Sequence, residues 1–135
     1  MPVITGVSVV TVVVRDAGEA LQFYTEKLGF QVAKDMRMGE NGPRWVSVIP
    51  QAGSHPELLL FNPTAFMPPE PANAMLDLIG KMPGHVLGTD DCRKTIAELE
   101  ARGVKILSQP QDYPYGVEAV FSDLYGNNFV VVEPR

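Results

Sequence analysis

The sequence has little of several features that mark common classes of protein. Its single cysteine, Cys92, excludes an internal disulfide and predicts a reducing compartment, the cytoplasm. The formal net charge is -5 and no basic stripe is present, so no nucleic-acid partner is expected. The apolar residues 3–14 are too few to span a bilayer and follow no basic segment, so we expect a strand there and no membrane partner. A nucleotide cofactor is not expected either, because a glycine-rich phosphate loop is missing.

The first half of the chain shows the pattern of a strand, a helix and three further strands. The β-branched run at residues 6–14 predicts a strand that is covered on both faces. Asp16 and Glu19 have the spacing of a capping box, which marks the start of a helix, and Gly29 marks its end. Three further strands are predicted, from residue 30, over 44–50 and over 58–63.

The second half repeats this order of elements. A strand over residues 86–89 is followed by Asp90 or Asp91 as the cap of a helix. Gly103 ends that helix 13 residues after Asp90, just as Gly29 lies 13 residues after Asp16. Further strands are predicted from residue 104, over 116–123 and over 129–134.

The repeat predicts an α+β fold of two tandem βαβββ modules, over about residues 5–63 and 83–135, in a single domain of 135 residues. Residues 64–82 between them are rich in proline, which prevents a continuous sheet, so we expect a connector with a short helix over 74–79. A four-stranded sheet with a helix on one face leaves its other face bare. Two modules are therefore expected to cover these faces against each other around a ligand cleft.

Three segments carry a resemblance to a known family. They are DAGEALQFYTEKLGF at 16–30, DDCRKTIAELEARGV at 90–104 and DLYGN at 123–127. With the paired modules, they resemble the vicinal oxygen chelate superfamily, which includes glyoxalase I, extradiol dioxygenases and the bleomycin and fosfomycin resistance proteins. The resemblance implies the glyoxalase/bleomycin resistance fold, a curved sheet with a cleft, and a homodimer. It leaves the chemistry open, because this fold hosts enzymes as well as binding proteins.

Metal-dependent members of that superfamily place one metal ligand on each of four strands. Counting from the motifs, the resemblance puts these ligands at Val9, at Glu57 or Leu59, at Gly84 and at Val130. Valine, leucine and glycine side chains have no donor atom, and a metal centre needs three or more donors. We therefore expect no metal cofactor.

The few other candidate donors and nucleophiles have ordinary interpretations. His85 lies one residue past the third ligand position, which in a strand means the opposite face. A bulge or a shifted register would reverse this, and His85 and Glu57 would then be ligands of one divalent ion. His55 is expected in an exposed loop, Cys92 in the core, and Glu133 in solvent.

A cleft without metal must recognise its ligand by shape and a few polar groups. The residues expected to line it are Val9, Trp45, Glu57, Leu59, Tyr115, Phe121 and Val130. Trp45 would stack on a planar ligand, unless it is a core residue. Glu57 is either a candidate catalytic residue, because a carboxylate in an apolar cleft has a raised pKa and is then a general base, or a strand-entry residue that faces solvent. Arg44 is either a partner for an acidic ligand or a surface residue.

Three functions fit these observations. The first is a metal-free protein that binds a small, partly apolar molecule, and the donorless positions Val9, Gly84 and Val130 favour it. The second is a metal-dependent lyase or dioxygenase of the same superfamily, whose ligands the counting has misplaced. The third is a metal-free enzyme that acts on a carbonyl compound through Glu57 or a tyrosine. Whether the protein is an enzyme stays open at this point.

Overall fold

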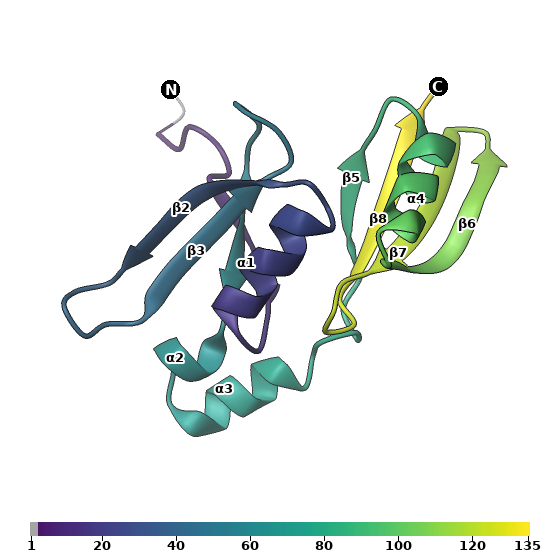
Figure 1. Cartoon of the computed structure of the whole chain (residues 1–135). Coiled ribbons are helices and arrows are strands. Elements are labelled where there is room, and N and C mark those ends of the chain that lie inside the picture. Colours follow the sequence, from purple (N-terminus) through teal and green to yellow (C-terminus); the bar gives the residue numbers. More distant parts are fainter. Residues whose placement is uncertain (1–2) are drawn as a thin grey trace. The chain divides into compact units, whose positions relative to one another are not determined.

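The computed structural model describes residues 3–135 and divides the chain into two compact units, one ending at Leu76 and the other beginning at Asp77. Each unit contains a four-stranded sheet with one helix of ten residues against one of its faces (Figure 1). The predicted pair of βαβββ modules is therefore confirmed. None of the helices in residues 3–135 has the length and apolar character needed to cross a membrane.

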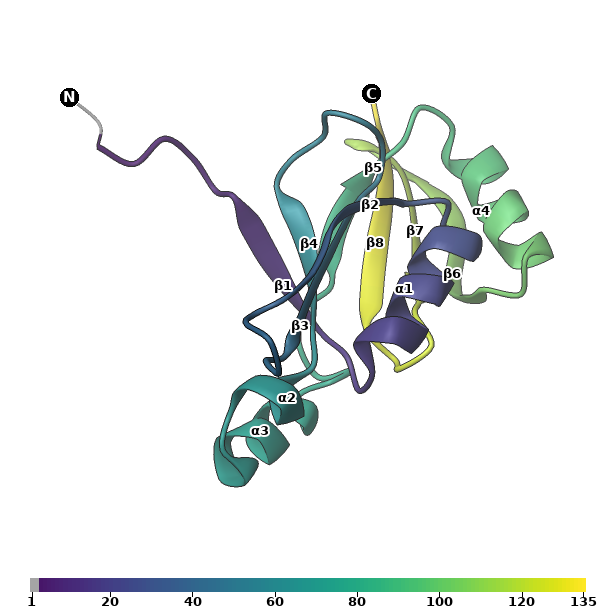
Figure 2. The ribbon, with the colours of Figure 1, turned by 60° about the vertical axis from the view of Figure 1, so that its left-hand side comes forward.

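The first unit contains one mixed sheet in the order β1–β4–β3–β2. β1 and β4 run parallel, and the other two pairs are antiparallel. The chain continues from β1 into α1 and returns through β2, β3 and β4. The elements are β1 (Val9–Val13), α1 (Ala17–Glu26), β2 (Gln31–Arg37), β3 (Arg44–Ile49) and β4 (Glu57–Phe61). In Figure 2, residues 3–8 run away from the start of β1 as a purple coil.

The second unit repeats the topology of the first, with the sheet order β5–β8–β7–β6. β5 and β8 run parallel, and the remaining pairs are antiparallel. The elements are β5 (His85–Gly88), α4 (Cys92–Ala101), β6 (Lys105–Tyr113), β7 (Gly116–Ser122) and β8 (Asn128–Pro134). The strands of both units begin within one residue of the predicted ones, except β1, which begins at Val9 instead of residue 6.

The helices α1 and α4 each begin at an aspartate whose carboxylate accepts a hydrogen bond from a backbone N–H three residues later. Asp16 accepts from Glu19 at 2.8 Å, and Asp91 accepts from Lys94 at 3.0 Å. Such a cap satisfies one of the free N–H groups of the first turn. Asp91, rather than Asp90, is thus the cap of α4. Gly29 and Gly103 follow the helices with φ angles of 74° and 89°, a conformation that other residues rarely adopt.

The core of each unit lies between the sheet and its helix, as strand alternation predicts. The helices α1 and α4 contact the strands β2–β4 and β6–β8 respectively. Buried apolar residues of the first unit in this layer are Val12, Val14, Ala20, Tyr24, Val46, Val48, Leu58 and Leu60, and Leu59 and Ala72 are buried elsewhere in the unit. Buried residues of the second unit are Cys92, Ile96, Leu99, Val104, Val117, Ala119, Phe121, Phe129 and Val131. The predicted burial of Cys92 is confirmed.

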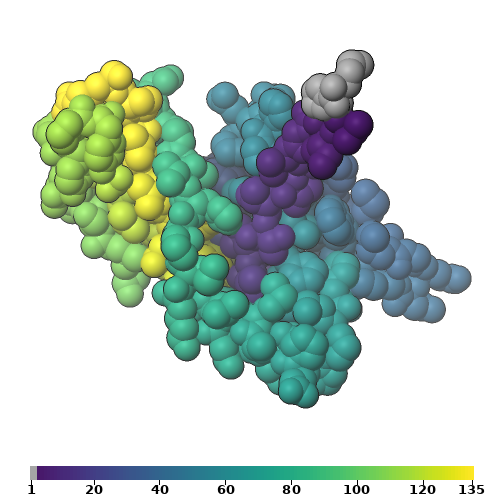
Figure 3. Space-filling model, turned by 180° about the vertical axis from the view of Figure 1, so that it is seen from behind, coloured from purple at the N-terminus to yellow at the C-terminus, as the bar shows by residue number. Residues whose placement is uncertain are grey.

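The proline-rich connector forms two helices earlier in the chain than the predicted single helix over 74–79. They are α2 (Pro63–Phe66) and α3 (Pro69–Leu76), and both belong to the first unit. Each begins with a proline, which costs nothing at the first helical position because that N–H has no partner inside the helix. α2 and α3 contact each other, and they form a teal lobe in the space-filling view (Figure 3). Prolines in this segment therefore start helices as well as prevent a continuous sheet.

Candidate functional site

The face of the first sheet opposite α1, called here the α1-distal face, collects most of the polar and apolar residues expected at a ligand site. Val48 and Leu58 are cross-strand partners on the α1 side, so their neighbours along β3 and β4 lie on the distal face. Val9 pairs with Glu57, Ser47 pairs with Leu59, and Met36 pairs with Trp45. Residues of this face include Val9, Thr11, Lys34, Met36, Trp45, Ser47, Glu57 and Leu59.

Glu57 is the centre of a hydrogen-bonded network on this face, the Lys34–Glu57–Ser47 network. The Ser47 hydroxyl donates to Glu57 Oε1 at 2.6 Å, and the Lys34 ammonium donates to Oε2 at 3.2 Å. The three side chains come from β3, β2 and β4. Ser47 is fully buried, whereas the Lys34 and Glu57 side chains are 48% and 21% exposed. The carboxylate of Glu57 thus accepts one hydrogen bond from a buried hydroxyl and another from a partly exposed ammonium.

A β-bulge is what brings Lys34 into this network. Val32 pairs with Val48, and regular alternation from there would place Lys34 on the α1 side. The register shifts between Val32 and Lys34, so that Lys34 pairs with Ser47 instead. An extra residue in one strand reverses the face of the residues that follow it. Lys34 was missing from the sequence-based expectations for this reason, and the apolar–polar pattern of β2 contains no clear signal of the bulge.

The network lowers the pKa of Glu57. The hydrogen bond from Ser47 is the largest cause, and the hydrogen bond and positive charge of Lys34 act in the same direction, against burial, which raises the pKa. The expectation of a raised pKa was therefore wrong, because the sheet supplies donors that the sequence pattern did not reveal. An ionised carboxylate whose two oxygens already accept hydrogen bonds is a weak general base.

Trp45, the only tryptophan, lies beside the network and has an unsatisfied donor. It precedes Ser47 by two residues on β3, and its cross-strand partner Met36 is 48% exposed. The indole Nε1 is buried and has no hydrogen-bond partner among residues 3–135. A buried N–H without an acceptor costs about 1–3 kcal/mol. The α1-distal face therefore combines an apolar aromatic surface with an unsatisfied donor.

The corresponding face of the second sheet, the α4-distal face, has a different composition. Val86 pairs with Val130, and Val130 pairs with Val120. Tyr115 donates its hydroxyl to Glu118 Oε1 at 2.9 Å and stacks on Tyr113, with ring centroids 5.4 Å apart. Partial desolvation, followed by the Glu118 hydrogen bond, raises the pKa of Tyr115. Val130 and Tyr115 thus belong to this face, and the Tyr115 hydroxyl is occupied by Glu118.

Phe121 does not belong with these residues, and its expected place in the ligand site was wrong. It pairs with Phe129, stacks on that ring at 5.3 Å and is only 1% exposed. Buried residues alternate along β7 at Val117, Ala119 and Phe121, which places all three in the core with α4. Phe121 is therefore a core residue of the second unit.

The positions at which the resemblance places metal ligands, Val9, Glu57 or Leu59, Gly84 and Val130, offer at most one donor side chain. His85 pairs with Phe129 and so lies on the α4 side of its sheet, the orientation that alternation predicted. A side chain at Gly84 would collide with the backbone carbonyl of Asn128. Glu57 is paired with Lys34. In residues 3–135, no three His, Cys, Asp or Glu side chains come close enough together to hold a metal ion.

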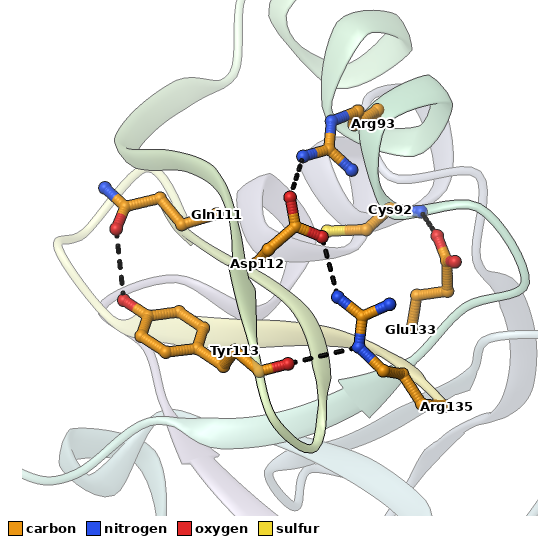
Figure 4. A network of polar contacts seen from close by, with 7 residues as sticks. All are labelled: Cys92, Arg93, Gln111, Asp112, Tyr113, Glu133 and Arg135. Atoms are coloured by element: carbon orange, nitrogen blue, oxygen red, sulfur yellow. Dashed lines mark hydrogen bonds and ion pairs between the residues drawn. The ribbon is translucent and has the colours of Figure 1, made fainter.

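On its α4 side, the second unit holds a polar network around the start of α4 (Figure 4). The carboxylate of Glu133 accepts from the backbone N–H of Cys92 at 2.9 Å, so the expectation that Glu133 is simply solvated was wrong. Burial is the main cause that raises the pKa of Cys92, and Glu133 adds to it. Asp112 accepts hydrogen bonds from Arg93 at 3.0 Å and from Arg135 at 2.7 Å. The network binds α4 to β6 and β8, and Cys92 has no features of a nucleophile.

The two remaining candidate residues are Arg44 and His55. Arg44 donates two hydrogen bonds to Asp35, both at 2.8 Å, and these raise the pKa of Arg44 and lower that of Asp35. Arg44 pairs with Arg37 on the α1 side of the register, two residues from Val46, so it is separated from the Glu57 network by the sheet. His55 is exposed in the loop before β4, as predicted.

Comparison with known proteins gives the family of this chain. Residues 6–131 match the Glyoxalase/Bleomycin resistance protein/Dioxygenase superfamily, and the chain belongs to it. A protein of Shewanella frigidimarina (strain NCIMB 400) is 36% identical over 122 residues, 87% of this chain and 85% of that protein. The crystal structure of UcmS2 is 37% identical with a TM-score of 0.81, covering 96% of this chain and 98% of UcmS2. TnmS3, an antibiotic binding protein from Streptomyces sp. CB03234, is 31% identical with a TM-score of 0.78, and the match covers 100% of both chains.

Proposed function

We propose that this member of the superfamily binds a small, partly apolar molecule on the α1-distal face without a bound metal. The observation that carries the proposal is the Lys34–Glu57–Ser47 network beside Trp45. Glu57, one of the two residues at which the resemblance places the second metal ligand, has an ammonium group as its partner here. The description of TnmS3 as an antibiotic binding protein supports a binding role.

The α1-distal face has the composition of a small-molecule site. Such sites are mostly apolar, with a small number of placed polar groups that orient the ligand. Val9, Leu59, Met36 and Trp45 supply the apolar part, and the Lys34–Glu57–Ser47 network supplies the polar part. The proposed assembly is a homodimer in the cytoplasm, and sedimentation at two protein concentrations tests the assembly.

The two enzymatic alternatives have less support. A metal-dependent lyase or dioxygenase needs donors where the chain has Val9, Gly84 and Val130. A metal-free enzyme that uses Glu57 as its base needs a carboxylate with a raised pKa, whereas the pKa of Glu57 is lowered. Binding without chemistry requires neither.

The test is a binding screen on protein treated with a chelator and desalted. Changes in the fluorescence of Trp45, the single tryptophan, report binding of aromatic and carbonyl compounds near β3. Val9→Lys, which places a charge on the α1-distal face, is expected to abolish binding. Val7→Lys is the matched control, because Val7 is 67% exposed before β1. Binding that disappears with the chelator and returns only with a divalent ion would overturn the proposal.

A further inference from the structure

We infer that the α1-distal face selects ligands with a neutral carbonyl oxygen, which accepts a hydrogen bond from the Lys34 ammonium. This inference rests on the proposed function and specifies its ligand class. Glu57 is one of the two residues, with Leu59, at which the resemblance places the second metal ligand, and here its partner is the Lys34 ammonium. The positive group that pairs with Glu57 in this chain therefore has protons to donate.

The network exposes its donor to a ligand more than its acceptor. Each oxygen of Glu57 already accepts one hydrogen bond, from Ser47 or from Lys34, and the Glu57 side chain is 21% exposed against 48% for Lys34. A lysine ammonium has three protons, and Glu57 is its acceptor among residues 3–135. The Lys34 side chain is 48% exposed, so its two remaining protons are open to a bound molecule. Trp45 Nε1 on the same face also lacks an acceptor among residues 3–135, but it is buried, so Lys34 supplies the exposed donor.

The charge balance of the network favours a neutral oxygen over an anionic one. The lowered pKa of Glu57 keeps its carboxylate ionised at neutral pH, so the charges of Lys34 and Glu57 cancel. A carboxylate ligand would add an unpaired negative charge beside Glu57, on a chain whose net charge is already -5. A carbonyl oxygen accepts the same hydrogen bond without that cost.

Glu57 acts in this scheme as a positioning residue for Lys34. A free lysine side chain has many rotamers, and fixing it during binding costs entropy. Glu57 fixes the ammonium beforehand, and the buried hydroxyl of Ser47 fixes Glu57. Substituting Glu57 would therefore change two things together: the placement of Lys34 and the neutrality of the network.

The inference is tested with three probes that share one tricyclic skeleton: fluorene, 9-fluorenone and fluorene-2-carboxylate. Fluorene has no acceptor, fluorenone adds a neutral carbonyl, and the third adds an ionised carboxylate. Equilibrium dialysis measures their affinities for the full chain. A hydrogen bond from a charged donor stabilises by about 1.5–3 kcal/mol, so fluorenone is expected to bind at least about tenfold more tightly than fluorene.

Variants separate the carbonyl contact from general effects on the fold. Lys34→Met is expected to remove the preference for fluorenone and to keep the affinity for fluorene, whereas Lys105→Met in the second unit leaves both unchanged. Lys34→Gln, which keeps a neutral donor, is expected to retain part of the preference. Glu57→Gln is expected to reverse the order of the two polar probes, because Lys34 then has no negative partner and favours the carboxylate. A residue that only supports the fold would not reverse this order.

The outcomes distinguish failure of this inference from failure of the proposed function. If none of the probes binds the wild-type chain, both fail for this ligand class. Equal affinity for fluorene and fluorenone would overturn the inference and leave metal-free binding standing. A wild-type preference for the carboxylate would overturn the neutral-oxygen assignment. A fluorenone preference that persists in Lys34→Met would overturn the role of Lys34.

Discussion

The two units form the same sheet-and-helix core, but the large side chains come from the helix in one unit and from the sheet in the other. In the first unit the large ring comes from the helix, where Tyr24 occupies the eighth position of α1. In the second unit that helical position is Leu99, and the large rings come from the sheet, as the stacked pair Phe121 and Phe129. The register places these two rings where the first sheet has the smaller Val48 and Leu58. A two-layer core thus needs a certain total side-chain volume, and either the helix or the sheet can supply the large side chains.

The distal faces differ in a more consequential way. The register places Ser108, Val120 and Asn128 in the second unit where the first has Lys34, Ser47 and Glu57. The ammonium–carboxylate network therefore exists in one unit alone among residues 3–135. The buried helix-side positions of the repeat keep their apolar character because they form the core, whereas the distal positions are free to diverge in chemistry. We locate the proposed function in the first unit on this basis.

The largest expected effect tests the difference between the cores of the two units. Phe129→Ala removes one ring of the stacked pair and leaves a cavity, which is expected to lower the free energy of unfolding by about 3–5 kcal/mol. Leu58→Ala is the matched change in the first unit and is expected to cost less, because it removes a smaller side chain and no ring stacking. Urea unfolding followed by circular dichroism measures both. A larger loss for Leu58→Ala would contradict the assignment of bulk to the second sheet.

The next effect concerns the network that the second unit lacks. Ser47→Ala removes the donor to Glu57 Oε1 and is expected to cost about 1–3 kcal/mol, because it leaves the acceptor of a partly buried charged group without its partner. It is also expected to raise the pKa of Glu57 toward the usual glutamate range, since Ser47 is the largest cause of the lowering. NMR titration of the carboxyl carbon measures this. Val120→Ala is the control at the equivalent position and should leave that titration unchanged.

A smaller difference is expected between the two helix caps. Asp16→Ala removes the carboxylate at the start of α1 and is expected to cost about 1 kcal/mol. Asp91→Ala is expected to cost less, because Glu133 still accepts from the N–H of Cys92 and keeps a negative charge at the start of α4. Thermal unfolding of both variants, and of Asp91→Ala combined with Glu133→Gln, tests this. Equal costs for the two single variants would argue against a capping contribution from Glu133.

The smallest effect is the stability that Glu57 contributes, which is present at neutral pH and is lost under acid conditions. The folded pKa of Glu57 lies below its unfolded value, so the unfolded chain binds the proton more tightly. The stability that Glu57 contributes is therefore present above the unfolded pKa of about 4.3 and is lost as the pH falls through the folded pKa. Glu57→Gln lacks this contribution at every pH. The stability difference between wild type and Glu57→Gln, measured by urea unfolding, is expected to shrink as the pH falls from neutral toward 3, and a constant difference would contradict the lowered pKa.

Much of the fold was predictable from the sequence because its signals are local. A cap is set by residues three apart, a helix end by a glycine, and a half-buried strand by alternation. These signals predicted both βαβββ units, the burial of Cys92 and the orientation of His85. They failed at the starts of α2 and α3, because a proline can begin a helix as well as interrupt a sheet. They also failed for Phe121, whose face is set by the register of β7 in its sheet.

The sequence by itself determined that this chain repeats one strand–helix–strand unit and that Val9, Gly84 and Val130, where the resemblance places metal ligands, have no donor atom in their side chains. Only the tertiary structure decided what surrounds Glu57. The bulge in β2 places Lys34 opposite Ser47, and the pairing of β3 with β4 brings Ser47 to the carboxylate. The physical reason is that a pKa and a ligand site depend on groups far apart in the chain. Strand register brings such groups together, and one inserted residue is enough to change the face on which a side chain lies.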